Sequence, residues 1–179
     1  ANPTMVLVDI QGVVDIAKKH GLKVFVDNTF ASPYNTNPLD FGVDVVIHSL
    51  TKYIGGHGDL LGGAVISNDT EFLRQCRLGT LMHFGSVIAP FTAFLASRGL
   101  KTLGVRMRQY NANALKIARW LESNPKIETV RYPMLESNPQ YEIAKRQMRG
   151  GSGMISFDVA GGLEAGKKFI NSLKLCTLA

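Results

Sequence analysis

The chain has 179 residues, of which 45% are apolar and 19% charged, and this is the composition of a globular protein long enough for one domain or for a domain with part of another. The net charge of +6 would suit a nucleic-acid-binding protein, but the basic residues occur singly or in pairs within stretches expected to be helical. Solvated helix faces explain this pattern more simply, so the composition argues against nucleic-acid binding.

Helical and strand patterns alternate through the first hundred residues. Asp9 can cap a helix whose apolar positions recur at i, i+3, i+4 and i+7 from Ile10, and Gly21 can end it. Short apolar runs at residues 23–27 and 43–48 are typical of buried parallel strands. Further expected elements are a loop at 28–37, a turn at 55–58, a strand at 60–67, and helices at 70–78 and 90–103. The alternation predicts an α/β layer with a mostly parallel sheet.

The pattern changes after residue 103. A long helix through residues 105–122 is expected to precede a small α+β unit. Its elements would be strands at 127–132 and 154–159, helices at 140–148 and 163–173, and a strand-like end at 175–179. We therefore place a domain boundary near Gly104, which divides the chain into residues 1–103 and residues 104–179.

Cysteine content and apolar runs indicate the compartment. The two cysteines, Cys76 and Cys176, are too few for a disulfide framework, which favours a reducing cytoplasm. No Cys-x-x-Cys or His-Glu-x-x-His motif occurs, so no metal site is predicted. The longest apolar runs are interrupted by Asp or Gly and are too short to span a bilayer. The first four residues do not resemble a secretory signal.

Chemically active side chains follow two of the predicted strands. Asp27 ends one strand, and Ser49, Thr51 and Lys52 follow the other; in parallel α/β sheets functional groups gather at such carboxyl ends. A lysine and a carboxylate placed in this way could form only a buried ion pair. They also supply an aldehyde cofactor's needs, namely an amine for a Schiff base, an anion for a pyridinium nitrogen and donors for a phosphate. The second interpretation explains more of the residues.

Two segments resemble the signatures of the Cys/Met-metabolism family of enzymes that use pyridoxal 5′-phosphate (PLP). These are VDNTFASPY at residues 26–34 and HSLTKYIGGHGD at residues 48–59, and further similar stretches occur at 2–4, 98–103 and 151–157. The resemblance implies a type I aminotransferase-like α/β fold, with helices on both faces of a mostly parallel sheet, and an assembly of four copies as a dimer of dimers. Residues 1–103 would form the C-terminal half of the large PLP-binding domain, and residues 104–179 the first part of the C-terminal α+β domain.

The same resemblance implies a role for each candidate residue. Lys52 would carry PLP as a Schiff base and, once released, act as the mobile general base. Asp27 would form a salt bridge with the pyridinium nitrogen, Ser49 and Thr51 would bind the phosphate, and Asn2 would lie against the ring hydroxyl. The family acts on small sulfur amino acids.

The reaction within the family is the least determined expectation. The His57-Gly58-Asp59 form of the second signature is most similar to methionine γ-lyases, whereas Leu81-Met82 stands where those enzymes typically carry a Lys-Asp pair. We predict a carbon–sulfur lyase that releases a 2-oxo acid, ammonia and a thiol from methionine, homocysteine or cystathionine. One alternative is γ-replacement, as in cystathionine γ-synthase or O-acylhomoserine sulfhydrylase. The other is an inactive fragment, because the family's ring-stacking tyrosine and substrate-carboxylate arginine fall outside these 179 residues.

Overall fold

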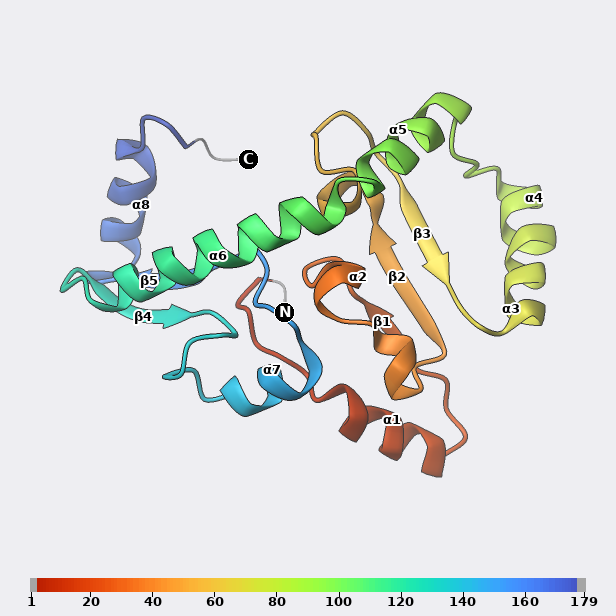
Figure 1. Cartoon of the computed structure of the whole chain (residues 1–179), viewed down its shortest axis with the longest axis horizontal. Helices are drawn as coiled ribbons and strands as arrows, with labels where there is room; N and C mark the ends of the chain where they lie inside the picture. The colour runs from red at the N-terminus through yellow and green to blue at the C-terminus, as the bar shows by residue number, and fades with distance from the viewer. Residues whose placement is uncertain (1–2, 177–179) are drawn as a thin grey trace.

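The computed structural model describes residues 3–176 and contains two sheets, which the long helix α6 connects (Figure 1). The first sheet has the order β1-β2-β3, with strands β1 (Phe25–Asp27), β2 (Val45–Ser49) and β3 (Gly63–Ile66). The helices of this part are α1 (Ile10–Lys19), α2 (Ser32–Asn35), α3 (Thr70–Gln75), α4 (Met82–Phe84) and α5 (Pro90–Leu100), with a 3₁₀ turn at Pro38–Phe41.

Helix α1 forms as its sequence predicts. The side chain of Asp9 caps it by accepting a hydrogen bond from the Gly12 N–H at 3.3 Å. Gly21, in the left-handed region at φ +64°, follows the end of the helix. The buried side chains of α1 pack with residues just before β1 and in or just before β2 in one apolar core, which comprises Ile10, Val14, Ala17, Val24, Val43 and Val46. This core fixes the position of the first two strands.

The sheet differs from expectation at its third strand. β1 pairs with β2 in parallel, but β3 pairs with β2 antiparallel. The chain between β2 and β3 forms one helical turn at Leu50–Ile54, and β3 then starts beside the carboxyl end of β2. A parallel β3 would have to start beside the amino end of β2, which requires a longer crossover connection. In the described sheet, one of the two pairings is therefore parallel.

The predicted loop at residues 28–37 contains the short helix α2. The Asn28 amide donates hydrogen bonds to the carbonyl oxygens of Ser32 (3.2 Å) and Thr36 (2.8 Å), which closes the segment on itself. Pro33 lies in the first turn of α2, where its missing N–H is tolerated. A buried asparagine thus gives order to a segment that composition alone describes as loop.

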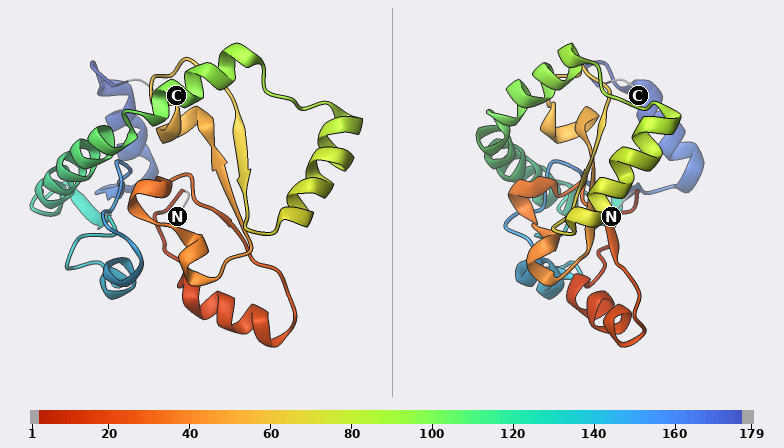
Figure 2. Two further views of the ribbon diagram at one scale, coloured as in Figure 1. Left: turned by 45° about the vertical axis from the view of Figure 1, so that its right-hand side comes forward. Right: turned by 90° about the vertical axis from the view of Figure 1, so that its right-hand side faces the viewer.

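The expected helix at residues 70–78 is longer in the structure. α3 continues through a π-helical segment (Cys76–Leu81) into α4, and none of these helices contains a buried residue. Figure 1 and the left view of Figure 2 show α3 and α4 set apart from the rest of the chain and joined to it by extended segments. Within residues 3–176, no helix is both long and apolar enough to cross a membrane.

The second part is built on α6 (Leu103–Glu122) and a two-stranded antiparallel sheet of β4 (Ile127–Arg131) and β5 (Ser156–Val159). Its other helices are α7 (Tyr141–Gln147) and α8 (Gly162–Ser172). The core side chains of this part are Ala114, Ala118, Tyr132 and Leu135. The strand expected at 175–179 is not formed at residues 175 and 176, and its other three residues lie outside the described part of the chain.

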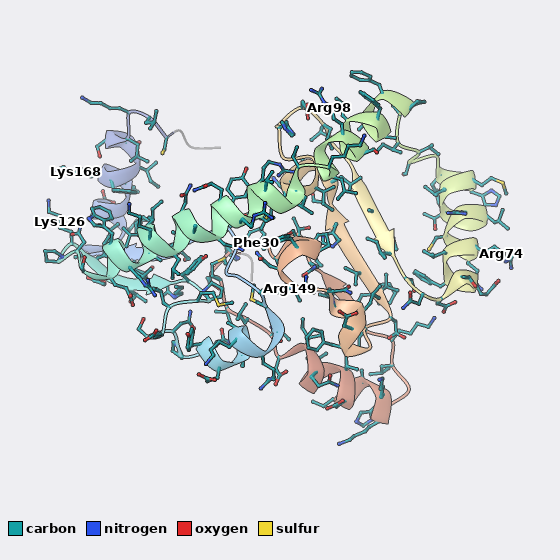
Figure 3. All side chains as sticks on the ribbon, viewed as in Figure 1. Phe30, Arg74, Arg98, Lys126, Arg149 and Lys168 are labelled. Atoms are coloured by element: carbon teal, nitrogen blue, oxygen red, sulfur yellow. The ribbon has the colours of Figure 1, made fainter. Side chains whose placement is uncertain are left out.

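Polar side chains join the two parts. The amide groups of Asn35 and Asn111 exchange hydrogen bonds of 3.0 and 2.8 Å, and the Arg149 N–H donates to the Asn35 carbonyl oxygen at 2.8 Å; Arg149 is labelled in Figure 3. Gln140 accepts from the Leu7 N–H and donates to the Leu7 carbonyl oxygen, at 2.7 and 2.6 Å. The domain boundary near Gly104 stays a prediction; in the structure that residue lies in the first turn of α6.

Candidate active site

Asp27 and Ser49 lie at the same edge of the first sheet. Because β1 and β2 run parallel and Asp27 pairs with Ile47, the two strands end within two residues of each other. Thr29 connects these ends, since its N–H donates to Asp27 Oδ1 at 2.9 Å and its hydroxyl accepts from the Ser49 N–H at 2.8 Å. This is the carboxyl edge at which parallel α/β sheets carry functional groups.

Lys52 lies in the helical turn directly after β2. The turn closes through hydrogen bonds from the Gly55 N–H to the Leu50 carbonyl oxygen and from the Gly56 N–H to the Lys52 carbonyl oxygen, both 2.8 Å. Lys52 itself departs from helical geometry, with φ −92° and ψ −123°. Thr51 Oγ1 accepts from the Gly62 N–H at 3.1 Å, which ties the turn to the segment before β3. The lysine is therefore held on an irregular but well-bonded turn.

The four described candidates all reach solvent to some degree. Asp27 and Lys52 are exposed, whereas Ser49 and Thr51 are half-buried. Asp27 and Lys52 form no salt bridge with each other, so the interpretation of a merely structural, buried ion pair is wrong for this chain. Asn2, the fifth candidate, lies outside the described residues.

A pocket beside Asp27 suits an aromatic ring with a cationic nitrogen. It lies between the two parts of the chain, and among residues 3–176 Asp27 is the one charged residue that lines it. Most of the other lining residues are apolar, including Met5, Val26 and Phe30, and Phe30 is labelled in Figure 3. Apolar walls with a few polar groups are characteristic of cofactor sites. Ser49, Thr51 and Lys52 lie outside this lining, at the end of the neighbouring strand.

His48 lies under the same edge of the sheet. It is 4% exposed, and this burial lowers the pKa of the imidazole, while the negative charge of Asp27 opposes the shift. Loss of its solvation favours the neutral ring. His48 is accordingly a buried, structural residue near the end of β2.

One contact to the Lys52 turn was not foreseen from the sequence. The guanidinium of Arg106, in the first turn of α6, donates to the carbonyl oxygens of Tyr53 and Ile54 at 2.7 and 3.3 Å. Sequence spacing provides no signal for this contact, because a backbone carbonyl can accept whatever side chain its residue carries. The neighbouring Tyr53 hydroxyl accepts from the Gly153 N–H at 3.0 Å, and burial raises the pKa of Tyr53.

Helix α5 also packs directly against the Lys52 turn. Gly99 is buried, and a Cβ atom there would overlap the Gly55 carbonyl oxygen and lie 2.7 Å from the Ile54 carbonyl oxygen. Only a glycine allows the two backbones to approach so closely.

We expect Gly99→Ala to destabilise the protein by about 1–3 kcal/mol, the usual range for overpacking. Loss of apparent unfolding free energy in urea measures this effect. Gly166→Ala is the matched control, because Gly166 is also helical but has open space around its missing Cβ; that change should be neutral or stabilising. Equal effects of the two substitutions would contradict the proposed close packing.

Known proteins match the chain over its whole length. The model of the family described as Cys/Met metabolism PLP-dependent enzyme matches residues 1–179. The chain is 49% identical to an L-methionine gamma-lyase of Porphyromonas gingivalis over 181 residues, covering 100% of the chain and 45% of that protein. It is 48% identical to a cystathionine gamma-synthase of Mycobacterium leprae, covering 99% of the chain and 46% of that protein.

A solved structure agrees with these sequence matches. The crystal structure of metB from Corynebacterium glutamicum superposes with a TM-score of 0.96 at 47% identity, covering 100% of this chain and 46% of that one. The chain thus spans less than half the length of these relatives, and the α/β fold predicted from its sequence is confirmed. The two signatures, at residues 26–34 and 48–59, begin at the ends of the neighbouring strands β1 and β2. Because the family model matches residues 1–179, the chain belongs to the family of Cys/Met metabolism PLP-dependent enzymes.

Proposed function

We propose that the complete protein is a PLP-dependent carbon–sulfur lyase in which Lys52 carries the cofactor. The observation that supports this most directly is the position of Asp27 at the end of β1 and of Lys52 just after the neighbouring parallel strand β2. They provide an amine and an anion at one sheet edge, and the anion, Asp27, lines a pocket whose other described lining residues are uncharged. When bound, PLP supplies an electron sink for negative charge developing on the substrate.

Lys52 would perform both the attachment and the proton transfers. Its amine is exposed and forms no ion pair within residues 3–176, so it is free to bind an aldehyde carbon covalently. Once a substrate amine displaces it, Lys52 Nζ would move the proton of the substrate's Cα to the cofactor, which would leave the amine free to take a proton from Cβ and to pass that proton to the departing sulfur. The thiol could then depart from Cγ.

Asp27 would hold the proton on the cofactor's ring nitrogen. Thr29 orients its carboxylate through the bond to Oδ1, and a hydrogen bond between charged groups is roughly twice as strong as one between neutral groups. Ser49 and Thr51, half-buried beside the Lys52 turn, would donate to the phosphate, and Asn2 would lie against the ring hydroxyl. These roles come from the family resemblance and agree with the residue types present.

The assembly and compartment are also proposals. We propose a homotetramer, as the family resemblance implies, and a cytoplasmic location. The chain's two cysteines, Cys76 and Cys176, are both free, which agrees with a reducing compartment. No membrane or nucleic-acid partner is proposed.

Leu81 and Met82 support a broad range of sulfur amino acid substrates rather than strict specificity for methionine. Both side chains are exposed, Met82 to 65%, in a segment that approaches the active site in the family. Apolar side chains discriminate only weakly between substrates that differ by a methylene group. We therefore expect activity on cystathionine, homocysteine and methionine.

Substrate assays of the complete protein test the lyase proposal. Methionine or homocysteine alone should yield 2-oxobutanoate and ammonia, and an acylhomoserine with cysteine or sulfide should react more slowly. The γ-replacement alternative predicts fast exchange of the ester group with negligible 2-oxobutanoate from any sulfur amino acid, and that result would reject the lyase. The alternative of an inactive fragment predicts that the 179-residue chain shows no absorbance of lysine-bound PLP once unbound PLP has been removed.

A further inference from the structure

We propose that Arg106 is a positioning residue that holds the Lys52 turn, so that the second part of the chain sets the place of the reactive amine. The inference deepens the proposed function and rests on Lys52 being the cofactor's carrier. Arg106 lies in α6, 54 positions after Lys52 in the sequence, and no role in the chemistry follows from its sequence context. Its contacts in the structure are the basis for this role.

Arg106 connects three segments through one planar group. Its Nη1 donates to the Tyr53 carbonyl oxygen at 2.7 Å, and its Nη2 donates to the Ile54 and Gly99 carbonyl oxygens at 3.3 and 2.9 Å. Its Nε donates to Thr102 Oγ1 at 3.0 Å, which orients the guanidinium from within the helix junction. The two residues that follow Lys52 are thereby tied to the end of α5 and to the start of α6.

The four acceptors explain why the residue is an arginine. All are neutral, and three are carbonyl oxygens at the C-terminal ends of helical segments, where a positive charge is favourable. They lie in different directions around the guanidinium, whose rigid fork of donors can reach them together. A lysine ammonium is a single point with three donors and cannot span the same set.

The backbone around the turn is shaped to admit the guanidinium. A Cβ atom on Gly56 would overlap the Arg106 guanidinium, and Gly56 adopts φ +72°, a left-handed conformation that favours glycine. Gly56 also closes the turn by donating to the Lys52 carbonyl oxygen at 2.8 Å. Arg106 therefore lies against the residue whose hydrogen bond defines the backbone position of Lys52.

A second tie from the same part of the chain supports this arrangement. The Tyr53 ring packs against Tyr110 of α6 with centroids 5.5 Å apart, and its hydroxyl binds the Gly153 N–H. These contacts hold the side chain of Tyr53, whereas Arg106 binds the main-chain carbonyl oxygens of Tyr53 and Ile54. Loss of Arg106 should thus leave Tyr53 anchored but loosen the backbone that carries Lys52.

The test compares Arg106→Gln and Arg106→Lys with the wild type in the complete protein. Arg108→Gln is the matched control, because it removes the same charge from an exposed position two residues further along α6. The first readout needs no cofactor: backbone hydrogen exchange of peptides covering residues 50–56 in the apoprotein. The second is the rate at which borohydride-trapped PLP accumulates on Lys52 after PLP is added, and the third is the division of the kinetic effect between kcat and KM.

We expect Arg106→Gln to speed exchange in residues 50–56 without a comparable change elsewhere, and to slow trapping at Lys52. Its kcat should fall by about tenfold to 100-fold, the range for displacing a reactive group by about an ångström, with KM changed less. Arg106→Lys should lie between Arg106→Gln and the wild type, and Arg108→Gln should match the wild type. Exchange that rises uniformly, or trapping and kcat equal to those of Arg108→Gln, would reduce Arg106 to a structural residue and overturn the proposal. If trapping marked a lysine other than Lys52, the proposed function would fail separately, and the exchange result would still report on the Arg106 contact.

Discussion

Replacing Lys52 with Ala in the complete protein should abolish the visible absorbance of lysine-bound PLP and essentially all turnover. The substitution removes the amine that attaches the cofactor and moves the protons, and no binding interaction replaces a covalent nucleophile. Absorbance spectra after incubation with PLP, followed by borohydride reduction and peptide mapping, measure the effect. In the wild type the reduced cofactor should be found on the peptide that contains Lys52.

Lys116→Ala is the control for this experiment. Lys116 is an exposed lysine of α6, and alanine there retains helix propensity, so colour and rate should be those of the wild type. If Lys52→Ala instead kept the wild-type colour and rate, another lysine would carry the cofactor. The assignment of Lys52 would then be wrong, although membership of the family would stand.

Asp27→Asn should lower kcat by several powers of ten while the fold survives. Asparagine has nearly the same shape, but it removes the negative charge that would keep the ring nitrogen protonated. Removing one hydrogen-bond donor that stabilises transition-state charge already lowers rates by about 10²–10³-fold. Steady-state kinetics measures the loss, and circular dichroism should show unchanged secondary structure because Asp27 is exposed and outside the core.

Asp15→Asn controls for the loss of a carboxylate in the same part of the chain. Asp15 is an exposed residue of α1 that accepts a hydrogen bond from Gln11 at 2.8 Å, so its substitution should leave the kinetics unchanged. An Asp27→Asn variant within about tenfold of the wild type (roughly 1.4 kcal/mol in activation free energy) would give Asp27 a structural role only.

The candidate site was predictable because its residues are adjacent to strong local signals. Asp27 and Lys52 each follow a short apolar run, and parallel strands bring such ends to one sheet edge. Helix α1 was likewise predictable from its cap at Asp9 and the spacing of its apolar residues, both of which act within a few positions. The two signatures around Asp27 and Lys52 then pointed to the cofactor chemistry.

The amino-acid sequence by itself therefore determined the local elements, the family and the residue types at the sheet edge. Only the tertiary structure decided the antiparallel direction of β3, the order of residues 28–37 around Asn28, and the hold of Arg106 on the Lys52 turn. The physical reason is that these features depend on hydrogen bonds to backbone groups, which are the same at every residue. A carbonyl such as that of Tyr53 becomes a specific partner only once folding has brought a distant donor beside it.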